Sequence, residues 1–494
     1  MATEEITFKL PYSFAKKYGI VVGEVKDNQA FVYHLPNTPL HAFSEVRRLV
    51  QCDLVLDEVN ENLFQQHLTN SYQSKSSILD ATEGMEDEMD LSLLASQLPM
   101  SEDLLENQDD APIIRLLNAL FTTAIKQKAS DIHIETYKHR VIVRNRIDGI
   151  LQEVLEIQRA IAPLVISRVK VMAKLDIAEK RIPQDGRISL HIGGHNIDVR
   201  VSTLPSTHGE RIVLRILDKQ AAQLDLNLLG MPASTLKTMR KMINQPHGII
   251  LVTGPTGSGK TTSLYAMLSE LNQVSRNILT IEDPIEYDLI GIGQTQVNNK
   301  VQMSFAKGLR AILRQDPDVV MIGEIRDFET AEIAVQASLT GHLVLSTLHT
   351  NTALGALTRL VDIGVESFLL SSSIIGLVAQ RLVRKLCPHC KTRHELRDDE
   401  KELMGVSKTT DLSKVFEPQG CDLCNQSGYK GRTGIYEIIT IDETLRRMVH
   451  KQESIQALEE YLRPTNPSIR QDGFKRVLSG DTSLAEILRV TTQN

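Results

Sequence analysis

The nonapeptide GPTGSGKTT, at residues 254–262, is the part of this sequence whose residue types and spacing most clearly fit a chemical task. It satisfies the pattern G-x-x-x-x-G-K-[ST] and lies between an apolar stretch, IILVT, and a helix-like stretch, SLYAMLSELN. In this context backbone N–H groups converge on phosphate oxygens, Lys260 reaches the β- and γ-phosphates, and the Thr261 hydroxyl binds Mg²⁺. The alternative is a glycine-rich turn that binds nothing. We predict a nucleoside triphosphate site, with ATP as the nucleotide, formed by Gly254, Pro255, Thr256, Gly257, Ser258, Gly259, Lys260, Thr261 and Thr262.

Hydrolysis needs a carboxylate that orients water or holds magnesium, in addition to the phosphate loop. The stretch VVMIGEIRD supplies Glu324 at the end of an apolar strand, and we predict that Glu324 is this group rather than a surface residue. Polar residues also flank two further strands, in TIEDPIEY and GHLVLSTLHTN. Because the ends of parallel strands share a sheet edge, we expect these residues beside the phosphate loop, although a lone histidine there is more often structural. They are Glu282, Asp283, Glu286, His342 and His349.

Four of the five cysteines form two close pairs, in CPHC and CDLC. Such a set permits disulfides, a redox dithiol or a thiolate cage for a metal. The N-terminus has no apolar signal region and no window approaches the roughly 18 apolar residues of a membrane helix, so we expect a cytosolic chain, where disulfides are rare. Two CxxC pairs offer the four soft donors of tetrahedral zinc, although the gap at residues 391–420 exceeds that of usual zinc ribbons. We predict structural zinc at Cys387, Cys390, Cys421 and Cys424, with idle or redox thiols as the alternative, and a core position for Cys52.

Composition and charge indicate a multidomain globular chain. At 494 residues, with 24% charged and 41% hydrophobic residues, the chain has room for about three or four domains. The net charge of −7 is uneven, because residues 76–110 are rich in Asp and Glu and contain no Lys or Arg. We interpret this segment as a solvated tether. No basic stripe is interleaved with aromatic residues, which argues against a nucleic-acid partner.

Hydrophobic periodicity indicates that the elements which position these residues form α/β domains. In residues 1–74 short apolar strands alternate with helical patches. Residues 111–219 begin with a helix that has Pro112 in its first turn and continue with alternating strands joined by turns such as Asp148-Gly149 and Gly193-Gly194, which predicts an antiparallel sheet. Farther on, buried-type strands between helices predict a parallel sheet covered on both faces.

The expected domains follow from these changes in pattern. They are an N-terminal α/β domain at 1–74, an acidic linker at 75–110, an antiparallel α/β domain at 111–219, a linker at 220–230, an ATPase core at 231–384, a tetracysteine zinc module at 385–430 and a C-terminal helical subdomain at 431–494.

Several motifs occur in an order that strongly resembles the secretion ATPases of type II secretion and type IV pilus systems. They are SDIHIE, RIPQDGRI, GPTGSGKTT, TIEDPIE, LRQDPDVVMIGEIRD and TLHTN, followed by the tetracysteine insert and GYKGRTGIYE. The resemblance covers about residues 111–494, and LPYSFAKKYGIVV is similar to the family's N-terminal domain. It implies a RecA-like motor core behind a PAS-like α/β domain. It also implies a cytoplasmic, hexameric ATPase that drives pseudopilus assembly and protein export across the outer membrane.

The resemblance assigns roles to individual residues. Residues 254–261 match the Walker A motif, Glu324 matches the Walker B glutamate, and the polar residues of TIEDPIEY and GHLVLSTLHTN match the Asp box and the His box. Arginines of the preceding domain close over the nucleotide in this family, and Arg200 and Arg215 match them. The corresponding basic residues of the motor domain are Arg310, Arg314 and Arg326, each of which could instead be a solvated arginine. Family retraction ATPases lack the tetracysteine insert, so the cysteines indicate an assembly-type motor.

The resemblance also implies partners. We expect residues 1–74 to dock on the cytoplasmic domain of an inner-membrane protein of the GspL type, with a structural cap on the ring as the alternative. We expect the motor to meet a platform protein of the GspF type, so that a cytoplasmic protein becomes peripherally attached to the inner membrane. The nearest rival function is a type IV pilus assembly ATPase. Two more distant rivals are a DNA-translocating motor and a nucleotide-gated scaffold without turnover.

Overall fold

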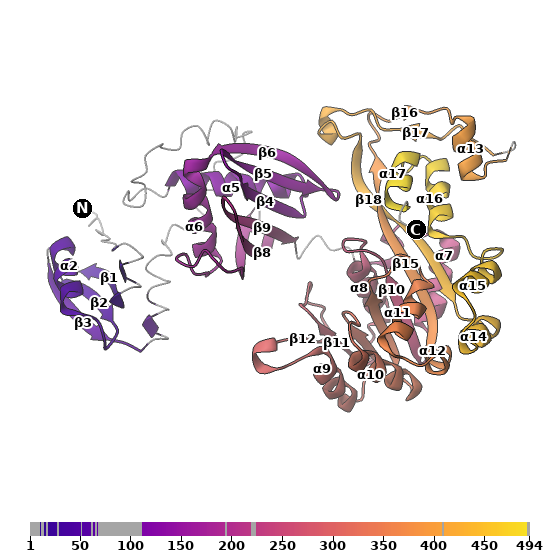
Figure 1. The fold of residues 1–494 in the computed structure, drawn as a ribbon, viewed down its shortest axis with the longest axis horizontal. Coiled ribbons are helices and arrows are strands. Elements are labelled where there is room, and N and C mark those ends of the chain that lie inside the picture. The colour runs from indigo at the N-terminus through magenta and orange to yellow at the C-terminus, as the bar shows by residue number, and fades with distance from the viewer. Residues whose placement is uncertain are drawn as a thin grey trace. The chain divides into compact units, whose positions relative to one another are not determined.

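The computed structural model describes residues 10, 14–15, 18–26, 29–50, 52–60, 63–64, 67, 111–192, 195–218, 224–407 and 410–491, and Figure 1 labels their elements. The chain divides into two compact units, Met1–Ala221 and Ala222–Asn494. The acidic tether and the Gly193-Gly194 turn lie outside the described residues. Among the helices that are described, none is long and apolar enough to cross a membrane.

The N-terminal part of the first unit has its own three-stranded sheet, in the order β1-β2-β3. Strand β2 pairs antiparallel with β1 and parallel with β3, and helix α2 makes the crossover that a parallel pair requires. Cys52 packs against this core but is only half-buried, so its expected core position holds in part. The elements are β1 (Ile20–Lys26), β2 (Gln29–His34), α2 (Leu40–Val50) and β3 (Asp53–Glu58).

The rest of the first unit is a six-stranded antiparallel sheet in the order β6-β5-β4-β9-β8-β7. One face buries alternate apolar side chains against helices α5 and α6, which leaves polar residues on the other face. Asp148 (φ 48°) and Gly149 (φ 85°) form the tight turn between β5 and β6, as the sequence predicts. The elements are α5 (Ala111–Lys126), β4 (Asp131–Thr136), β5 (Arg140–Ile147), β6 (Ile150–Gln158), α6 (Ala162–Met172), β7 (Gln184–Ile192), β8 (His195–Ser206) and β9 (Gly209–Asp218).

A seven-stranded sheet, in the order β12-β11-β13-β14-β10-β15-β18, forms the centre of the second unit, and helices cover both of its faces (Figure 1). Side chains of β10 alternate between two hydrophobic cores: Ile249 and Leu251 lie in one, Ile250 and Val252 in the other. This burial on both faces explains the continuous apolar strands of the sequence and confirms the predicted α/β class. The strands are β10 (Gly248–Thr253), β11 (Ile278–Glu282), β12 (Gly293–Gln296), β13 (Val319–Ile322), β14 (Leu343–Leu348), β15 (Ile374–Leu386) and β18 (Tyr429–Thr440).

The helices divide between the two faces of this sheet. Helices α7 and α8 share one core, whereas α9 to α12 and α14 to α17 share the other. They are α7 (Ala233–Ile243), α8 (Lys260–Leu271), α9 (Phe305–Ile312), α10 (Phe328–Leu339), α11 (Gly355–Ile363), α12 (Ser367–Ser373), α14 (Glu443–His450), α15 (Ile455–Leu462), α16 (Ile469–Leu478) and α17 (Leu484–Thr491).

The tetracysteine module is inserted between β15 and β18, which pair antiparallel along most of their length. It contains β16 (Thr392–Arg393), α13 (Asp398–Met404), β17 (Phe416–Glu417) and the short helix Asp422–Cys424. The expected boundary at residue 431 falls inside β18, which completes the core sheet. The expectation that residues 431–440 belong to a separate C-terminal subdomain is therefore wrong, because these residues are part of β18. The sequence of an edge strand does not indicate which sheet the strand joins.

Candidate nucleotide site and cysteine cluster

The phosphate loop connects the end of β10 to helix α8. The helix begins at Lys260, which is earlier than the apolar pattern of SLYAMLSELN indicates. Gly259 precedes it in the left-handed conformation (φ 87°), and a Cβ atom there would lie 2.8 Å from Nε2 of Gln380. Both observations favour glycine at this position. Lys260 and Thr261 are thereby placed in the first turn of the helix, where backbone N–H groups are free to bind an anion.

Lys260 is buried and turns back onto its own loop. Its Nζ atom donates hydrogen bonds to the carbonyl oxygens of Gly254 (2.8 Å) and Pro255 (3.1 Å). Burial lowers the pKa of Lys260 to about 8, against the opposing attraction of Glu324. The hydroxyl of Ser258 is also buried and has no hydrogen-bond partner among the described residues. A loop with a buried ammonium and an unpaired hydroxyl fits a phosphate group.

Glu324 lies at the same sheet edge as the phosphate loop, because β13, β14 and β10 are adjacent and parallel. Its carboxylate forms an ion pair with Arg326 and lies 3.5 Å from Nε2 of His349, which follows β14. Burial, together with the charges of Lys260 and Arg326, lowers the pKa of His349, so its ring is neutral near pH 7. The structure therefore brings together the predicted residues Lys260, Glu324, His349 and Arg326.

The Asp-box residues have different environments. Glu282 is buried and accepts hydrogen bonds from the hydroxyl of Tyr265, from Thr280 (2.6 Å) and from Gln294 (3.0 Å). These bonds tie the end of β11 to α8 and β12. Asp283 is exposed, and its charge acts on Arg326. The backbone N–H of Glu286 donates to Tyr265. The charge of Asp283 therefore reaches the ion pair of Glu324.

His342 does not lie at this edge. It immediately precedes β14, and its Nδ1 atom lies 2.8 Å from the carbonyl oxygen of Ala337 at the end of α10. Because β14 runs parallel to β10, the start of β14 meets the start of β10 rather than the phosphate loop. The expectation that both histidines gather beside the loop is wrong for His342, since the two ends of one strand belong to opposite sheet edges.

The predicted arginines are distributed over both units. Arg200 and Arg215 are opposite each other on β8 and β9 of the first unit. Arg310 pairs with Glu329 on the surface of the second unit, and Arg314 is exposed.

One interaction in the first unit was not anticipated from the sequence. Asp131, in the SDIHIE motif, is buried and accepts a hydrogen bond from Nε of Arg215 at 3.0 Å. Alternation along β4 was a usable signal, because it places Asp131, His133 and Glu135 on one face of the sheet. The carboxylate of Asp131 therefore holds the Nε atom of Arg215, whose side chain is 56% exposed.

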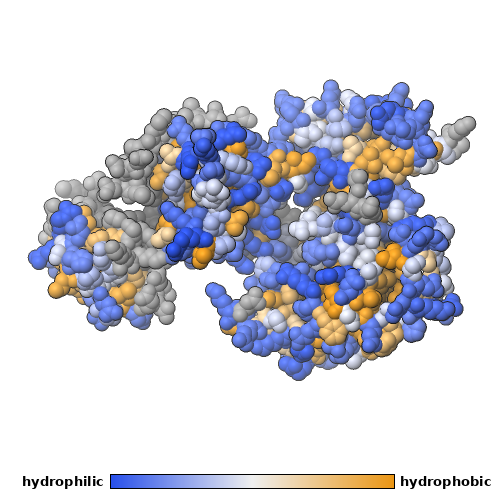
Figure 2. Space-filling view, viewed as in Figure 1, coloured by the Kyte–Doolittle hydropathy of each residue, from blue (hydrophilic) through white to orange (hydrophobic). Residues whose placement is uncertain are grey.

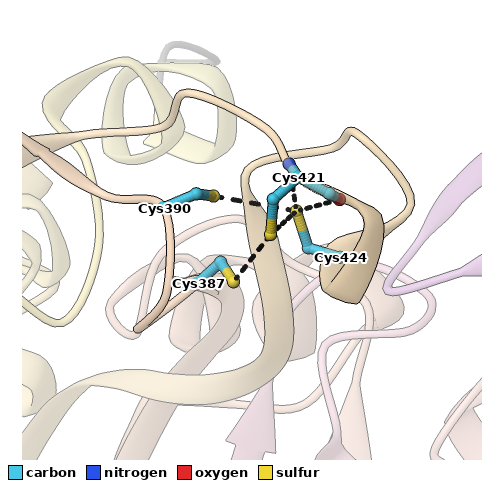
Figure 3. A group of neighbouring side chains, drawn as sticks. All are labelled: Cys387, Cys390, Cys421 and Cys424. Carbon is cyan, nitrogen blue, oxygen red and sulfur yellow. Dashed lines mark hydrogen bonds between the residues drawn. The ribbon is translucent and has the colours of Figure 1, made fainter.

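The four paired cysteines point toward one another from two loops (Figure 3). Their Sγ atoms are 3.9 Å apart for Cys387 and Cys421, 3.8 Å for Cys390 and Cys424, and 3.7 Å for Cys421 and Cys424. A tetrahedral zinc with Zn–S bonds of ~2.3 Å would separate its sulfurs by about 3.8 Å, whereas a disulfide needs ~2.05 Å. The cluster thus has the spacing of a four-thiolate metal site.

Backbone donors support the thiolate form of Cys424, whereas burial raises the pKa of Cys421 to about 11. The N–H groups of Cys421 and Gly428 each donate to Sγ of Cys424 at 3.2 Å. Burial raises the pKa of the Cys424 thiol, but these bonds outweigh it and bring the pKa to about 7. Figure 2 shows mostly hydrophilic residues over the visible face of the module at the top of the view. A small module with such a surface is the kind that a metal stabilises in place of a large core.

Comparisons with known proteins extend these observations to the whole chain. The family described as Type II/IV secretion system protein matches residues 106–489, and a domain family of GSPII protein E matches residues 9–72. Type II secretion system protein E of Aeromonas hydrophila is 55% identical, and Type II secretion system ATPase E of Vibrio cholerae is 56% identical. Each alignment covers 98% of this chain and 97% of the relative.

Solved structures share the architecture. The pilus retraction motor PilT with bound ADP is 28% identical, with a TM-score of 0.52 over 75% of this chain and 95% of that chain. The Legionella pneumophila ATPase DotB is 21% identical, with a TM-score of 0.58 over 77% of this chain and 96% of that chain, which is a likeness of fold.

Proposed function

This chain belongs to the family of type II/IV secretion system proteins, and we propose that it is the motor that powers a type II secretion system. It is an ATP-hydrolysing ATPase with a P-loop core, as its family and relatives indicate. The observation that carries the proposal is the gathering of Lys260, Glu324 and His349 at one sheet edge. The match of residues 9–72 to a domain of GSPII protein E favours type II secretion over pilus assembly.

The chemistry follows from the positions of these side chains. Backbone N–H groups of residues 254–261 and the ammonium of Lys260 bind the phosphates of ATP, and the Thr261 hydroxyl offers a ligand to magnesium. Bound Mg²⁺ would neutralise charge on the β- and γ-phosphates. Glu324 orients and deprotonates the attacking water, and neutral His349, whose Nε2 atom lies 3.5 Å from the carboxylate, is placed to help orient it.

Activation of Glu324 requires a change at its ion pair. In the structure the guanidinium of Arg326 occupies a carboxylate oxygen of Glu324 that would have to accept a hydrogen bond from the attacking water. The γ-phosphate is a stronger partner for an arginine than a single carboxylate. We therefore expect Arg326 to leave Glu324 when ATP occupies the loop, with Asp283 available to hold the displaced guanidinium.

Zinc is the metal that we assign to Cys387, Cys390, Cys421 and Cys424. The sulfur spacing and the two backbone N–H bonds to Cys424 support this assignment. Its role would be structural, since four protein ligands leave no open position for a substrate.

Assembly into a homohexamer and docking through the N-terminal domain complete the proposal. Arg200 and Arg215 belong to a unit other than the one that carries the phosphate loop. In an assembled ring such arginines would neutralise charge on the γ-phosphate. Residues 1–74 would bind the cytoplasmic domain of an inner-membrane protein of the GspL type, and the motor unit would contact a platform protein of the GspF type. The protein would thus be cytoplasmic and attached peripherally to the inner membrane.

A complementation experiment tests this function. The full-length chain is expressed in a bacterium that lacks its own type II secretion ATPase, and secretion of a known exoprotein is measured together with pilus assembly. We expect restored secretion, and no secretion from a Lys260→Ala variant produced at the same level. Restored pili without secretion would contradict the type II assignment.

A further inference from the structure

The GYKGRTGIYE motif contains a tyrosine that the proposed chemistry does not use. Tyr436 lies on β18 and is only 3% exposed. It is directly opposite Gln380 on β15, so both side chains project from the same face of the sheet toward helix α8. A buried hydroxyl and a buried amide in this position need hydrogen-bond partners, and those partners connect two parts of the motor unit.

Gln380 contacts both ends of the phosphate loop. Its Oε1 atom accepts a hydrogen bond from the hydroxyl of Ser263 at 2.7 Å, in the first turn of α8. Its Nε2 atom lies close beneath Gly259, and its carbonyl oxygen borders the space that a Cβ atom on Gly254 would take. Any shift of the loop on phosphate binding therefore acts on Gln380 and Ser263, which are 2% and 0% exposed.

Tyr436 connects Gln380 to residues 226–230, the segment that follows the linker from the preceding domain. Its hydroxyl donates to the carbonyl oxygen of Leu229 at 3.0 Å. The ring lies across Gly434, where a Cβ atom would clash with the tyrosine oxygen. Glycine in the motif thus makes room for the ring to reach Leu229. The side chain of Tyr436 lies beside that of Gln380, because the two residues are cross-strand neighbours on β18 and β15.

Two further contacts fix the same region. Gly230 has φ 82°, and a Cβ atom there would clash with Oγ1 of Thr433, so the segment lies tightly against β18. The backbone N–H of Tyr436, on the outer edge of the sheet, donates to Oδ2 of the buried Asp472 at 3.0 Å. Both ends of the tyrosine are therefore held, and the ring has little freedom to adopt another position.

We propose that Tyr436 is a positioning residue for ATP hydrolysis, which couples the phosphate loop to Leu229 through Ser263 and Gln380. When phosphate draws Lys260 away from Gly254, the first turn of α8 readjusts. The Ser263–Gln380 hydrogen bond, the cross-strand contact of Gln380 with Tyr436 and the Tyr436–Leu229 hydrogen bond transmit that change to the segment at residues 226–230. In the sequence, this segment follows the domain that carries Arg200 and Arg215. The inference rests on the proposed function only in requiring that ATP binds the phosphate loop.

Tyr429 supplies a matched control. It lies on the same strand, is 8% exposed, and forms a comparable hydrogen bond of 2.7 Å, but with Ser483 before α17 rather than with Leu229. Tyr436→Phe and Tyr429→Phe each remove one buried hydroxyl. A purely structural role predicts the same consequences for both variants.

The experiment uses the full-length protein and measures four quantities: the Kd for a non-hydrolysable ATP analogue, kcat for ATP, KM for ATP, and amide exchange in peptides within residues 224–232 with and without the analogue. In the wild type, we expect the analogue to change exchange at these residues. In Tyr436→Phe we expect this change to be lost and kcat to fall about 3- to 10-fold, while Kd stays within about threefold. Tyr429→Phe should behave as the wild type does.

Two results would overturn the proposal. One is that Tyr436→Phe shows the same exchange response and the same kcat as Tyr429→Phe. The other is that the analogue binds the wild type but amide exchange at residues 224–232 does not change. If Tyr436→Phe does not fold, Ser263→Ala tests the other end of the network with the same readouts and the same criteria. A wild type that binds no nucleotide would instead refute the proposed function.

Discussion

The ammonium of Lys260 donates to the carbonyl oxygen of Gly254 at 2.8 Å, so the loop that would bind phosphate holds its own lysine. The contact is buried, and burial lowers the pKa of Lys260 to about 8. Phosphate must replace the carbonyl oxygens as the partner of the ammonium. Because the phosphate is anionic, it stabilises the charged form of the lysine and raises its pKa in the complex.

This difference in pKa predicts how nucleotide affinity depends on pH. Below pH 8 the free protein already carries the charged lysine, so affinity is constant. Above pH 8 the free lysine is neutral and must take up a proton when ATP binds, so affinity falls by up to about tenfold per pH unit. Titration with a fluorescent ATP analogue between pH 7 and 9.5 measures the effect. Lys260→Arg should show weaker binding with no such fall, and a wild-type affinity that is flat to pH 9.5 would contradict the argument.

The cysteine cluster predicts a stoichiometric metal. Elemental analysis of the purified protein should find about one zinc per chain. Cys421→Ser removes one thiolate and should lose most of the metal, lower the melting temperature of the module and leave nucleotide binding intact. Cys52→Ser is the control, since Cys52 lies outside the cluster. Protein without bound metal, or zinc that remains stoichiometric in Cys421→Ser, would refute the site.

Arg200 and Arg215 belong to a different unit of the chain from the phosphate loop, which predicts that activity depends on assembly. Specific ATPase activity should rise with protein concentration as rings form, and Arg215→Ala should lose most of it. Arg140→Ala is a suitable control, because Arg140 is on the same sheet and its side chain forms an exposed ion pair with Glu156. Activity that is independent of concentration in a preparation shown to be monomeric would eliminate the assembled site.

The N-terminal domain predicts membrane recruitment that is separable from catalysis. Its sheet and helix α2 have a hydrophobic core of their own. Deletion of residues 1–74 should therefore spare nucleotide binding while it abolishes co-sedimentation with membranes and secretion in cells. A truncated protein that still co-sediments and supports secretion would refute the docking role.

Local patterns in the sequence predicted most of the architecture and part of the site. Strands β10, β11, β13 and β14 were visible because burial on both faces demands continuous apolar residues. The phosphate loop, Glu324 and the cysteine pairs were visible because their chemistry depends on short, fixed spacings.

Features that depend on contacts between distant segments could not be predicted. The place of β18 in the core sheet follows from pairing with a strand that ends at Leu386, before the cysteine module. The position of His342, in contrast, was predictable, because it precedes a strand of the expected parallel sheet whereas the phosphate loop follows one. The bonds from Arg215 to Asp131 and from Tyr436 to Leu229 join residues that no local pattern associates.

The central claim is that Glu324 activates water at a site where Lys260 holds the phosphates. The most direct test measures ATP binding and phosphate release by the wild type, Glu324→Gln and Lys260→Ala under the same conditions. We expect Glu324→Gln to bind ATP and magnesium with near wild-type affinity and to release phosphate about 10²- to 10⁴-fold more slowly, whereas Lys260→Ala should lose productive binding. Phosphate release by Glu324→Gln at the wild-type rate would contradict the account.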